Sequence, residues 1–204
     1  MSNTSGSGTG TGNVTVNGSG TTLGGTGTIS GTVTLGNTTP GAILNPGPSG
    51  ADGTSASVGT LHTGALTLAG ANTLHVDAFG TATTQWDQVV VGGTGAATLG
   101  TTSSLQLAIA TAGLNFTAGT TYILIDATTI SGSFSNATEG SIVSVNGYNF
   151  TAHYDAGSGN FDLIAIPEPS TWLAAALAVS AIGLSQRKRL RACASFAVKS
   201  IFNF

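Results

Sequence analysis

Histidine and aspartate recur two residues apart in this chain, a spacing that could hold a metal ion or orient a general base. One residue separates His75 from Asp77, and one separates His153 from Asp155. Residues at i and i+2 of a strand point to the same face, so each pair would lie together. Imidazole and carboxylate are zinc ligands and also a general-base arrangement. The ordinary alternative is the polar face of a half-buried strand, which we favour for both pairs; His62 is isolated.

Other catalytic patterns are absent from the sequence. Asp77 and Asp87 could meet on adjacent rungs of a β-helix, as paired carboxylates do in glycosidases, but no Lys or Arg precedes residue 187 to stabilise charge. There is no G-x-S-x-G nucleophile elbow and no G-x-x-x-x-G-K phosphate loop. The single cysteine, Cys193, excludes an intrachain disulfide and a cysteine zinc site. We therefore predict no enzyme activity, no catalytic residue, no metal and no cofactor.

Short apolar pairs between residues 12 and 110 indicate the elements that position these side chains. The chain has 204 residues, of which 6% are charged and 31 are glycine. A period of two is typical of strands with one face inward, and stacked short rungs can share one continuous core. We predict a mainly β fold, a parallel β-helix (solenoid) of short Gly/Thr-rich rungs over residues 12–110 after a flexible segment at 1–11; an irregular β-sandwich is the alternative. The pairs include Val14 and Val16, Val33 and Leu35, Leu66 and Leu68, Leu74 and Val76, Val89 and Val91, and Leu105 and Leu107.

Longer strands are expected over residues 111–166. Asn146-Gly147 is typical of a β-hairpin with a type I′ turn, which would place Val145 opposite Tyr148. A second turn at residues 156–159 leads to another strand at 160–166. We expect a C-terminal antiparallel meander that closes the open end of the stack.

The composition changes at residue 167. Pro167-Glu168-Pro169 interrupts any strand, because proline lacks the ladder donor. An uncharged apolar run and then a basic cluster follow, an order typical of a membrane stop. We predict one short transmembrane helix of about 22 Å, against a hydrocarbon core of roughly 30 Å; a buried core helix is the alternative. The membrane segment comprises Trp172, Leu173, Leu177, Val179, Ile182 and Leu184, and the membrane stop comprises Arg187, Lys188, Arg189 and Arg191.

Residues 167–191 resemble the PEP-CTERM sorting domain of Gram-negative bacteria. The resemblance lies in the Pro-Glu-Pro motif, the apolar run Trp172–Leu184 and the basic cluster. It implies that an exosortase-type sorting enzyme processes the chain near Pro167-Glu168-Pro169. It also implies an inner-membrane sorting intermediate that then reaches the cell surface or the extracellular matrix. The family's proteins carry an N-terminal export signal, which residues 1–20 do not display, and no role is predicted for residues 192–204.

The preceding body resembles the strand repeats of autotransporter passenger domains. The phrases Thr21–Ile29, Trp86–Val91 and Ile130–Ser135 carry this resemblance. It implies a right-handed parallel β-helix, without implying a chemistry.

Charge is segregated along the chain. All five basic residues lie at or after Arg187 and all eight acidic residues lie before it, for a net charge of −3. A body without cations cannot neutralise phosphates, which excludes nucleic acid as a partner of the body. We predict an exported structural or adhesin-like protein whose Thr and Asn ladders could contact extracellular polysaccharide; Trp86 is the one body residue suited to sugar stacking. The alternatives are a carbohydrate-binding or carbohydrate-active β-helix, or a truncated piece of a larger adhesin.

Overall fold

The chain forms two compact units, Met1–Ile166 and Pro167–Phe204. The computed structural model describes residues 1–166 except 37–38, 94 and 110–112, and it describes residues 177–182 of the second unit. We call the first unit the β unit.

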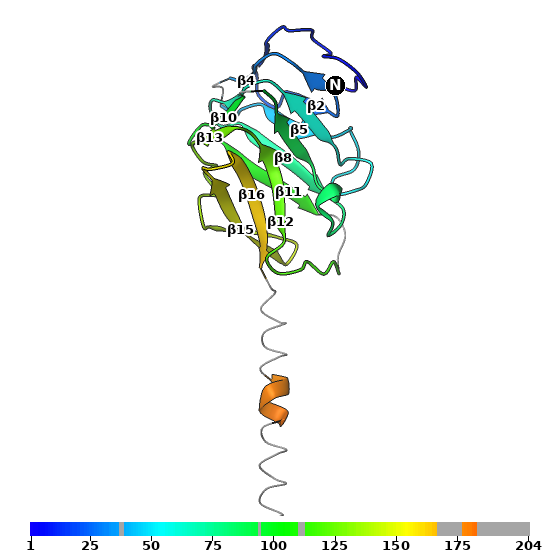
Figure 1. Cartoon of the computed structure of the whole chain (residues 1–204), viewed down its shortest axis with the longest axis vertical. Coiled ribbons are helices and arrows are strands. Elements are labelled where there is room, and N and C mark those ends of the chain that lie inside the picture. Colours follow the sequence, from blue (N-terminus) through cyan, green and yellow to red (C-terminus); the bar gives the residue numbers. More distant parts are fainter. Residues whose placement is uncertain (37–38, 94, 110–112, 167–176, 183–204) are drawn as a thin grey trace, which may run out of the picture. The chain divides into compact units, whose positions relative to one another are not determined.

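The β unit is a parallel solenoid extended by antiparallel strands (Figure 1). Its three sheets have the orders β1-β4-β7-β10-β13, β11-β8-β5-β2 and β14-β15-β16-β12-β9-β6-β3. Strand numbers from β1 to β13 advance by three within a sheet and pair in parallel, so the chain visits each sheet once per turn. The elements are β1 (Val14–Val16), β2 (Thr22–Gly25), β3 (Thr28–Ile29), β4 (Val33–Leu35), β5 (Ile43–Pro46), β6 (Thr60–Thr63), β7 (Leu66–Leu68), β8 (Thr73–Ala78), the 3-10 helix η1 (Thr83–Gln85), β9 (Gln88–Val91), β10 (Ala96–Leu99), β11 (Ser104–Ile109), β12 (Thr121–Asp126), β13 (Thr129–Ser131), β14 (Ile142–Val145), β15 (Tyr148–Asp155) and β16 (Asn160–Ile166).

In-register stacking puts like residues above one another in the interior. Leu35 of β4 pairs with Leu68 of β7, and Leu68 pairs with Leu99 of β10. Leu35 and Leu68 are fully buried, and Leu99 is 3% exposed. The apolar pairs of the sequence therefore form continuous columns, which confirms the prediction of a mainly β parallel solenoid. Parallel pairing continues past residue 110, since β12 stacks on β9 and β13 on β10.

A buried asparagine joins the corners of adjacent turns. Asn72, between β7 and β8, is fully buried. Its Oδ1 accepts a hydrogen bond from the backbone N–H of Ala42 at 2.9 Å, and its Nδ2 donates to the carbonyls of Leu35 and Gly36 at 3.2 Å. The side chain thus satisfies backbone groups that a tight corner leaves without ladder partners, which removes the penalty of burying them unpaired.

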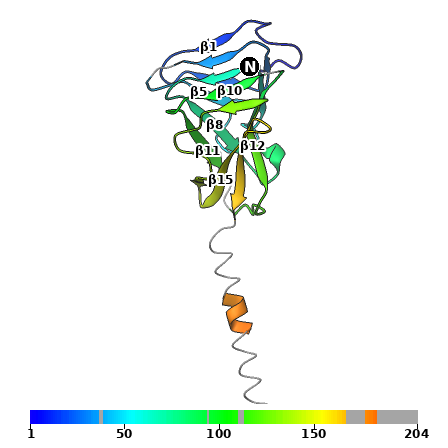
Figure 2. The same cartoon turned by 60° about the vertical axis from the view of Figure 1, so that its left-hand side comes forward.

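The predicted antiparallel meander is present at the end of the stack opposite β1 (Figure 2). Val145 lies opposite Tyr148, as expected from a two-residue loop. Asn146 and Gly147 have φ of 48° and 87°, the positive values that a type I′ turn requires. Strand β16 then pairs antiparallel with β12, so the meander extends one solenoid sheet.

An aromatic cluster fills the interior beneath the meander. Trp86 stacks on Tyr122 with ring centroids 4.2 Å apart and meets Phe150 edge-on at 5.3 Å. Phe116 contacts Phe150 and Tyr148 edge-on. Trp86 is only 3% exposed and its indole N–H donates to the carbonyl of Gly80 at 3.0 Å. The suggestion that Trp86 could stack on a sugar is therefore wrong, because the ring is part of the core.

The first residues, which composition predicts to be flexible, make backbone contacts along β2 and β3. The terminal ammonium of Met1 donates to the carbonyl of Gly24 at 2.5 Å, and the carbonyl of Met1 accepts from Thr26 at 2.9 Å. Asn3 Oδ1 accepts from the backbone N–H of Thr28 at 2.9 Å. This segment therefore lies along an edge of the solenoid that would otherwise expose unpaired backbone groups.

The prediction of a transmembrane helix is wrong. Within the described part of the chain, residues 177–182 are helical, and no helix is long and apolar enough to cross a bilayer. The uncharged run Trp172–Leu184 holds 13 residues, which as a helix would rise about 20 Å, against roughly 30 Å of hydrocarbon. Apolar composition and flanking charges favoured a span, but the run is too short for one. Leu177, Val179 and Ile182 are 61%, 71% and 61% exposed, while residues 167–176 and 183–204 lie outside the described residues.

Replacing Trp86 should weaken the β unit more than any surface change. Trp86→Ala leaves a void among the stacked rings and should lower the free energy of unfolding by about 3–5 kcal/mol. Urea denaturation followed by circular dichroism measures this loss. The control is Ile142→Ala, because Ile142 is apolar but 62% exposed; its effect should stay within about 0.5 kcal/mol. Equal losses for the two variants would contradict a core role for Trp86.

Candidate functional site

His75 and Asp77 lie on the same face of β8, as their spacing predicts, but that face is not half-exposed. His75 is 7% exposed and Asp77 is 1% exposed. Leu74 and Val76, on the other face, are fully buried in the core. Strand β8 is thus covered on both sides, so the expected polar face of a half-buried strand is wrong. The sequence could not reveal the cover, because it comes from a loop between other strands.

The cover is the loop of residues 47–59, between β5 and β6. The N–H of Gly53 donates to Asp77 Oδ1 at 2.7 Å, and the N–H of Gly59 donates to Asp87 Oδ1 at 2.7 Å. Gly47 begins the loop with φ +97°, and a Cβ there would lie 1.9 Å from the carbonyl oxygen of Ser57. Only glycine tolerates both constraints, so Gly47 allows the loop to fold back onto β8.

Asp77 and Asp87 lie close together, but within one turn of the solenoid, on β8 and directly before β9, and not on adjacent rungs as the sequence suggested. Asp87 Oδ2 accepts the backbone N–H of Asp77 at 2.9 Å, and Asp87 is fully buried. Burial raises the pKa of Asp87 from 3.8 to about 8, opposed by the N–H groups of Asp77 and Gly59 and reinforced by the negative charge of Asp77. Both Asp87 oxygens and Asp77 Oδ1 accept backbone N–H groups, so these carboxylates fasten the loop to the solenoid.

A third acid completes a cluster around His75. Asp52, on the loop, places Oδ1 3.8 Å from His75 Nε2, and Asp77 Oδ1 lies 3.4 Å from the same nitrogen. The three ligand atoms lie within 4.8 Å of one another. We call these residues the Asp52–His75–Asp77 cluster. Sequence spacing found two of its members and missed Asp52, which lies 23 residues before His75 and is brought near by the folded loop.

His153 and Asp155, the second predicted pair, have different partners in the structure. His153 Nδ1 lies 3.6 Å from Asp162 Oδ2, its cross-strand neighbour on β16. Asp155 instead accepts the hydroxyl of Ser158 at 2.7 Å and the N–H of Gly157 at 2.8 Å, which lower its pKa. Burial raises the pKa of Asp162, and His153 opposes the rise. The register of β15 and β16, which single-strand spacing cannot show, selects the partner.

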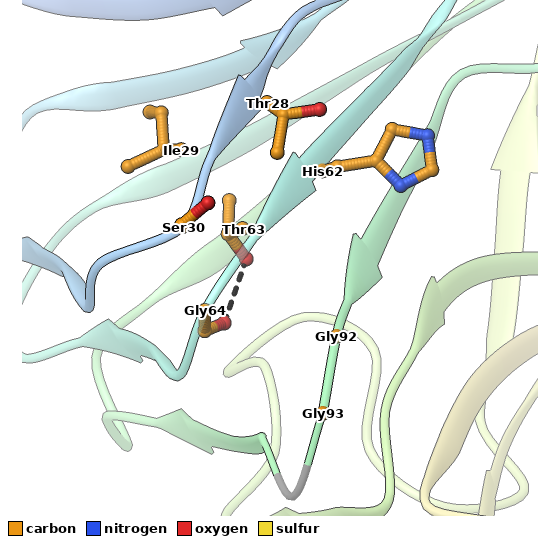
Figure 3. A pocket seen from close by; sticks show the side chains of 8 residues that line it. All are labelled: Thr28, Ile29, Ser30, His62, Thr63, Gly64, Gly92 and Gly93. Atoms are coloured by element: carbon orange, nitrogen blue, oxygen red, sulfur yellow. Dashed lines mark hydrogen bonds between the residues drawn. The ribbon is translucent and has the colours of Figure 1, made fainter. Parts of the chain in front are cut away.

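His62 lies beside an open hollow of about 420 Å³ (Figure 3). Thr28 of β3 and His62 of β6 are direct neighbours in the sheet, and Thr63 Oγ1 donates to the carbonyl of Gly64 at 3.0 Å. Glycines 92 and 93 continue the wall. Among the described residues, His62 is the one ionisable side chain that lines the hollow. The rest of the lining offers hydroxyl and backbone groups, so His62 has no acid or base beside it with which to catalyse a reaction.

A ladder of hydroxyl groups follows one outer face of the solenoid. Thr34 of β4 lies between two fully buried residues, so its side chain points away from the core. The same position on each strand of the sheet is Thr or Ser, in register, and Ser131 Oγ donates to Thr98 Oγ1 at 3.4 Å. Strand spacing of about 4.8 Å makes the ladder about 19 Å long. The hydroxyl ladder comprises Thr15, Thr34, Thr67, Thr98 and Ser131.

Most of the predicted sorting residues lie outside the part of the chain that the structure describes. Leu177, Val179 and Ile182 belong to the helical residues 177–182 and are exposed. The remaining residues of the Pro-Glu-Pro motif, the apolar run and the basic cluster lie outside the described residues.

Comparison of the chain with protein-family models, with curated proteins and with solved structures finds no significant match in any of the three.

The buried carboxyl of Asp87 predicts a pH-dependent stability. Its folded pKa of about 8 lies above 3.8, so between these values the folded chain holds a proton that the unfolded chain has released. The free energy of unfolding should therefore fall as the pH rises across this window. Asp87→Asn has no titrating proton and keeps one acceptor oxygen, so in this variant the free energy of unfolding should decrease less as the pH rises. A smaller decrease should remain, because the pKa of Asp162 is also raised.

Urea denaturation of the wild type and the variant at several pH values between 4 and 8 measures this difference. Asp126→Asn is the control: Asp126 is exposed on β12 and its charge acts on Asp162 but not on Asp87, so this variant should keep the contribution of Asp87 to the fall. If the free energy of unfolding depended on pH in the same way in the wild type and in Asp87→Asn, the pH dependence would not come from Asp87.

Proposed function

We propose that this chain is an exported structural protein whose β unit is displayed at the cell surface or in the extracellular matrix. One observation carries the proposal: the β unit ends at Ile166, the last residue of β16, and the Pro-Glu-Pro motif begins at the next residue. Processing next to Pro167 would therefore remove the sorting segment and leave every strand of the solenoid in place. The resemblance of residues 167–191 to a sorting signal supports the same conclusion.

A structural role also agrees with the state of the acidic side chains. Asp77 and Asp87 are the carboxylates that could have formed a hydrolytic pair, and both are buried and occupied by backbone N–H groups. The β unit carries no Lys or Arg. Catalysis on a polysaccharide needs an accessible acid or base beside the substrate, and these carboxylates do not offer one.

The hydroxyl ladder is the surface that we propose contacts extracellular polysaccharide. It is uncharged, regular and about 19 Å long, with one hydroxyl and one methyl group per threonine rung. Hydroxyl groups both donate and accept hydrogen bonds, so a row of them matches the hydroxyls of a glycan chain. This observation favours adhesion through hydrogen bonds over sugar stacking, for which the buried Trp86 is not available.

The mass of the mature protein tests the proposed export. Protein recovered from the native cell surface or culture medium should have an intact mass that ends near residues 167–169, because the sorting enzyme removes the segment that follows. Mass spectrometry of each cell fraction makes the measurement. In the control variant Glu168→Ala, which alters only the motif, the chain should stay unprocessed. A wild-type mass that extends to Phe204 and is found only inside the cell would overturn the proposal.

Replacement of ladder hydroxyls tests the polysaccharide contact. Val has the shape of Thr without the hydroxyl, so the triple variant Thr34→Val, Thr67→Val, Thr98→Val should keep the fold. Loss of three hydrogen bonds at about 1 kcal/mol each should weaken binding to extracellular polysaccharide from the native host at least tenfold. Surface plasmon resonance measures the affinity.

The matched control places the same change on another sheet. Thr60, Thr121 and Thr151 lie on β6, β12 and β15, and their exposure matches that of the three ladder residues. Their triple replacement by Val should leave binding unchanged. Equal losses for both variants, or no binding by the wild type, would refute a role for the ladder.

A further inference from the structure

His75 is a buried imidazole with an unsatisfied nitrogen. Its side chain is 8% exposed, and Nε2 has no hydrogen-bond partner among the described residues. This nitrogen points at two carboxylate oxygens, from Asp52 and Asp77. A buried polar atom without a partner destabilises a fold, so its presence calls for a further group at this place.

The distances fit a metal ion better than a proton. A charge-assisted hydrogen bond from an imidazolium would bring nitrogen and oxygen to about 2.7–2.9 Å. The observed separations from His75 Nε2 are 3.4 Å to Asp77 and 3.8 Å to Asp52. Ligand atoms about 2.0–2.1 Å from a tetrahedral zinc ion lie roughly 3.4 Å from each other, which is close to both separations.

We propose that the Asp52–His75–Asp77 cluster binds a divalent transition-metal ion of the zinc class. One imidazole and two carboxylates suit zinc and its neighbours, whereas calcium and magnesium prefer sites made only of oxygen. Two carboxylate charges balance the charge of the ion. Three protein ligands leave one tetrahedral position for water, and Asp52, with a side chain 67% exposed, marks the solvent side of the site. This site departs from the expectation of no metal drawn from the sequence, and it is independent of the proposed function.

The surrounding contacts prepare Asp77 as a ligand. The N–H of Gly53 holds Asp77 Oδ1 at 2.7 Å, which fixes the orientation of the carboxylate and leaves a second lone pair for the ion. Gly53 follows Asp52 directly, so loop 47–59 supplies both a ligand and the group that orients another. A bound ion would therefore join the loop to β8 and restrain its opening.

Zinc titration of the full chain tests the proposal. Protein treated with a chelator and then dialysed should bind one Zn²⁺ in isothermal titration calorimetry, with a rise in melting temperature. Asp52→Asn removes one ligand at an exposed position whose loss should not disturb folding. It should weaken zinc binding at least tenfold, about the effect of disturbing a metal's ligand shell. His75→Gln should abolish binding, and circular dichroism verifies that each variant is folded.

Asp126→Asn is the matched control, an exposed acid on β12 outside the cluster, and its zinc affinity should equal that of the wild type. With Co²⁺ as the probe, the wild type should show the visible absorption of a tetrahedral site, and Asp52→Asn should lose it. Absence of zinc binding by the wild type would overturn the proposal. So would unchanged affinity in Asp52→Asn, which would place the ion elsewhere on the chain.

Discussion

In-register stacking of parallel strands is the constraint on which the rest of this structure depends. Because Leu35, Leu68 and Leu99 occupy the same position in successive turns, one apolar column runs through the interior. The same register places Thr34, Thr67 and Thr98 in a column outside. Burial of the inner column stabilises each rung only when its neighbours are present. Because the inner and outer columns share this register, the same sequence repeat produces both the core and the hydroxyl ladder.

Corners and loops must then satisfy the backbone groups that the sheets leave unpaired. Buried Asn and Asp side chains do this at chosen points, as Asn72 does between two turns and Asp87 does for the loop of residues 47–59. The acids that resembled catalytic groups in the sequence are thus bound to the backbone. Asp52 and His75 differ, because they face each other without a hydrogen bond that would satisfy the imidazole.

Local patterns predicted the fold well, and long-range packing limited the prediction of the site. The period of two and the Asn146-Gly147 turn depend on neighbouring residues, and both were confirmed. The partners of His75 and His153 come from a distant loop and from an adjacent strand, which no spacing along one strand can reveal. Trp86 was misjudged for the same reason, since its ring packs against residues from β12 and β15. The transmembrane prediction failed because apolar composition was given more weight than length.

The aromatic cluster makes the two ends of the solenoid unequal. At the meander end, large rings from several elements interlock, whereas β1 at the other end presents only the small side chains of Val14–Val16 to its neighbour β4. In a stack where each turn contacts only the next, local opening begins where the terminal contact is weakest. We therefore expect amide hydrogen exchange in this β unit to be polarised along its axis, fastest at β1 and slowest around Trp86.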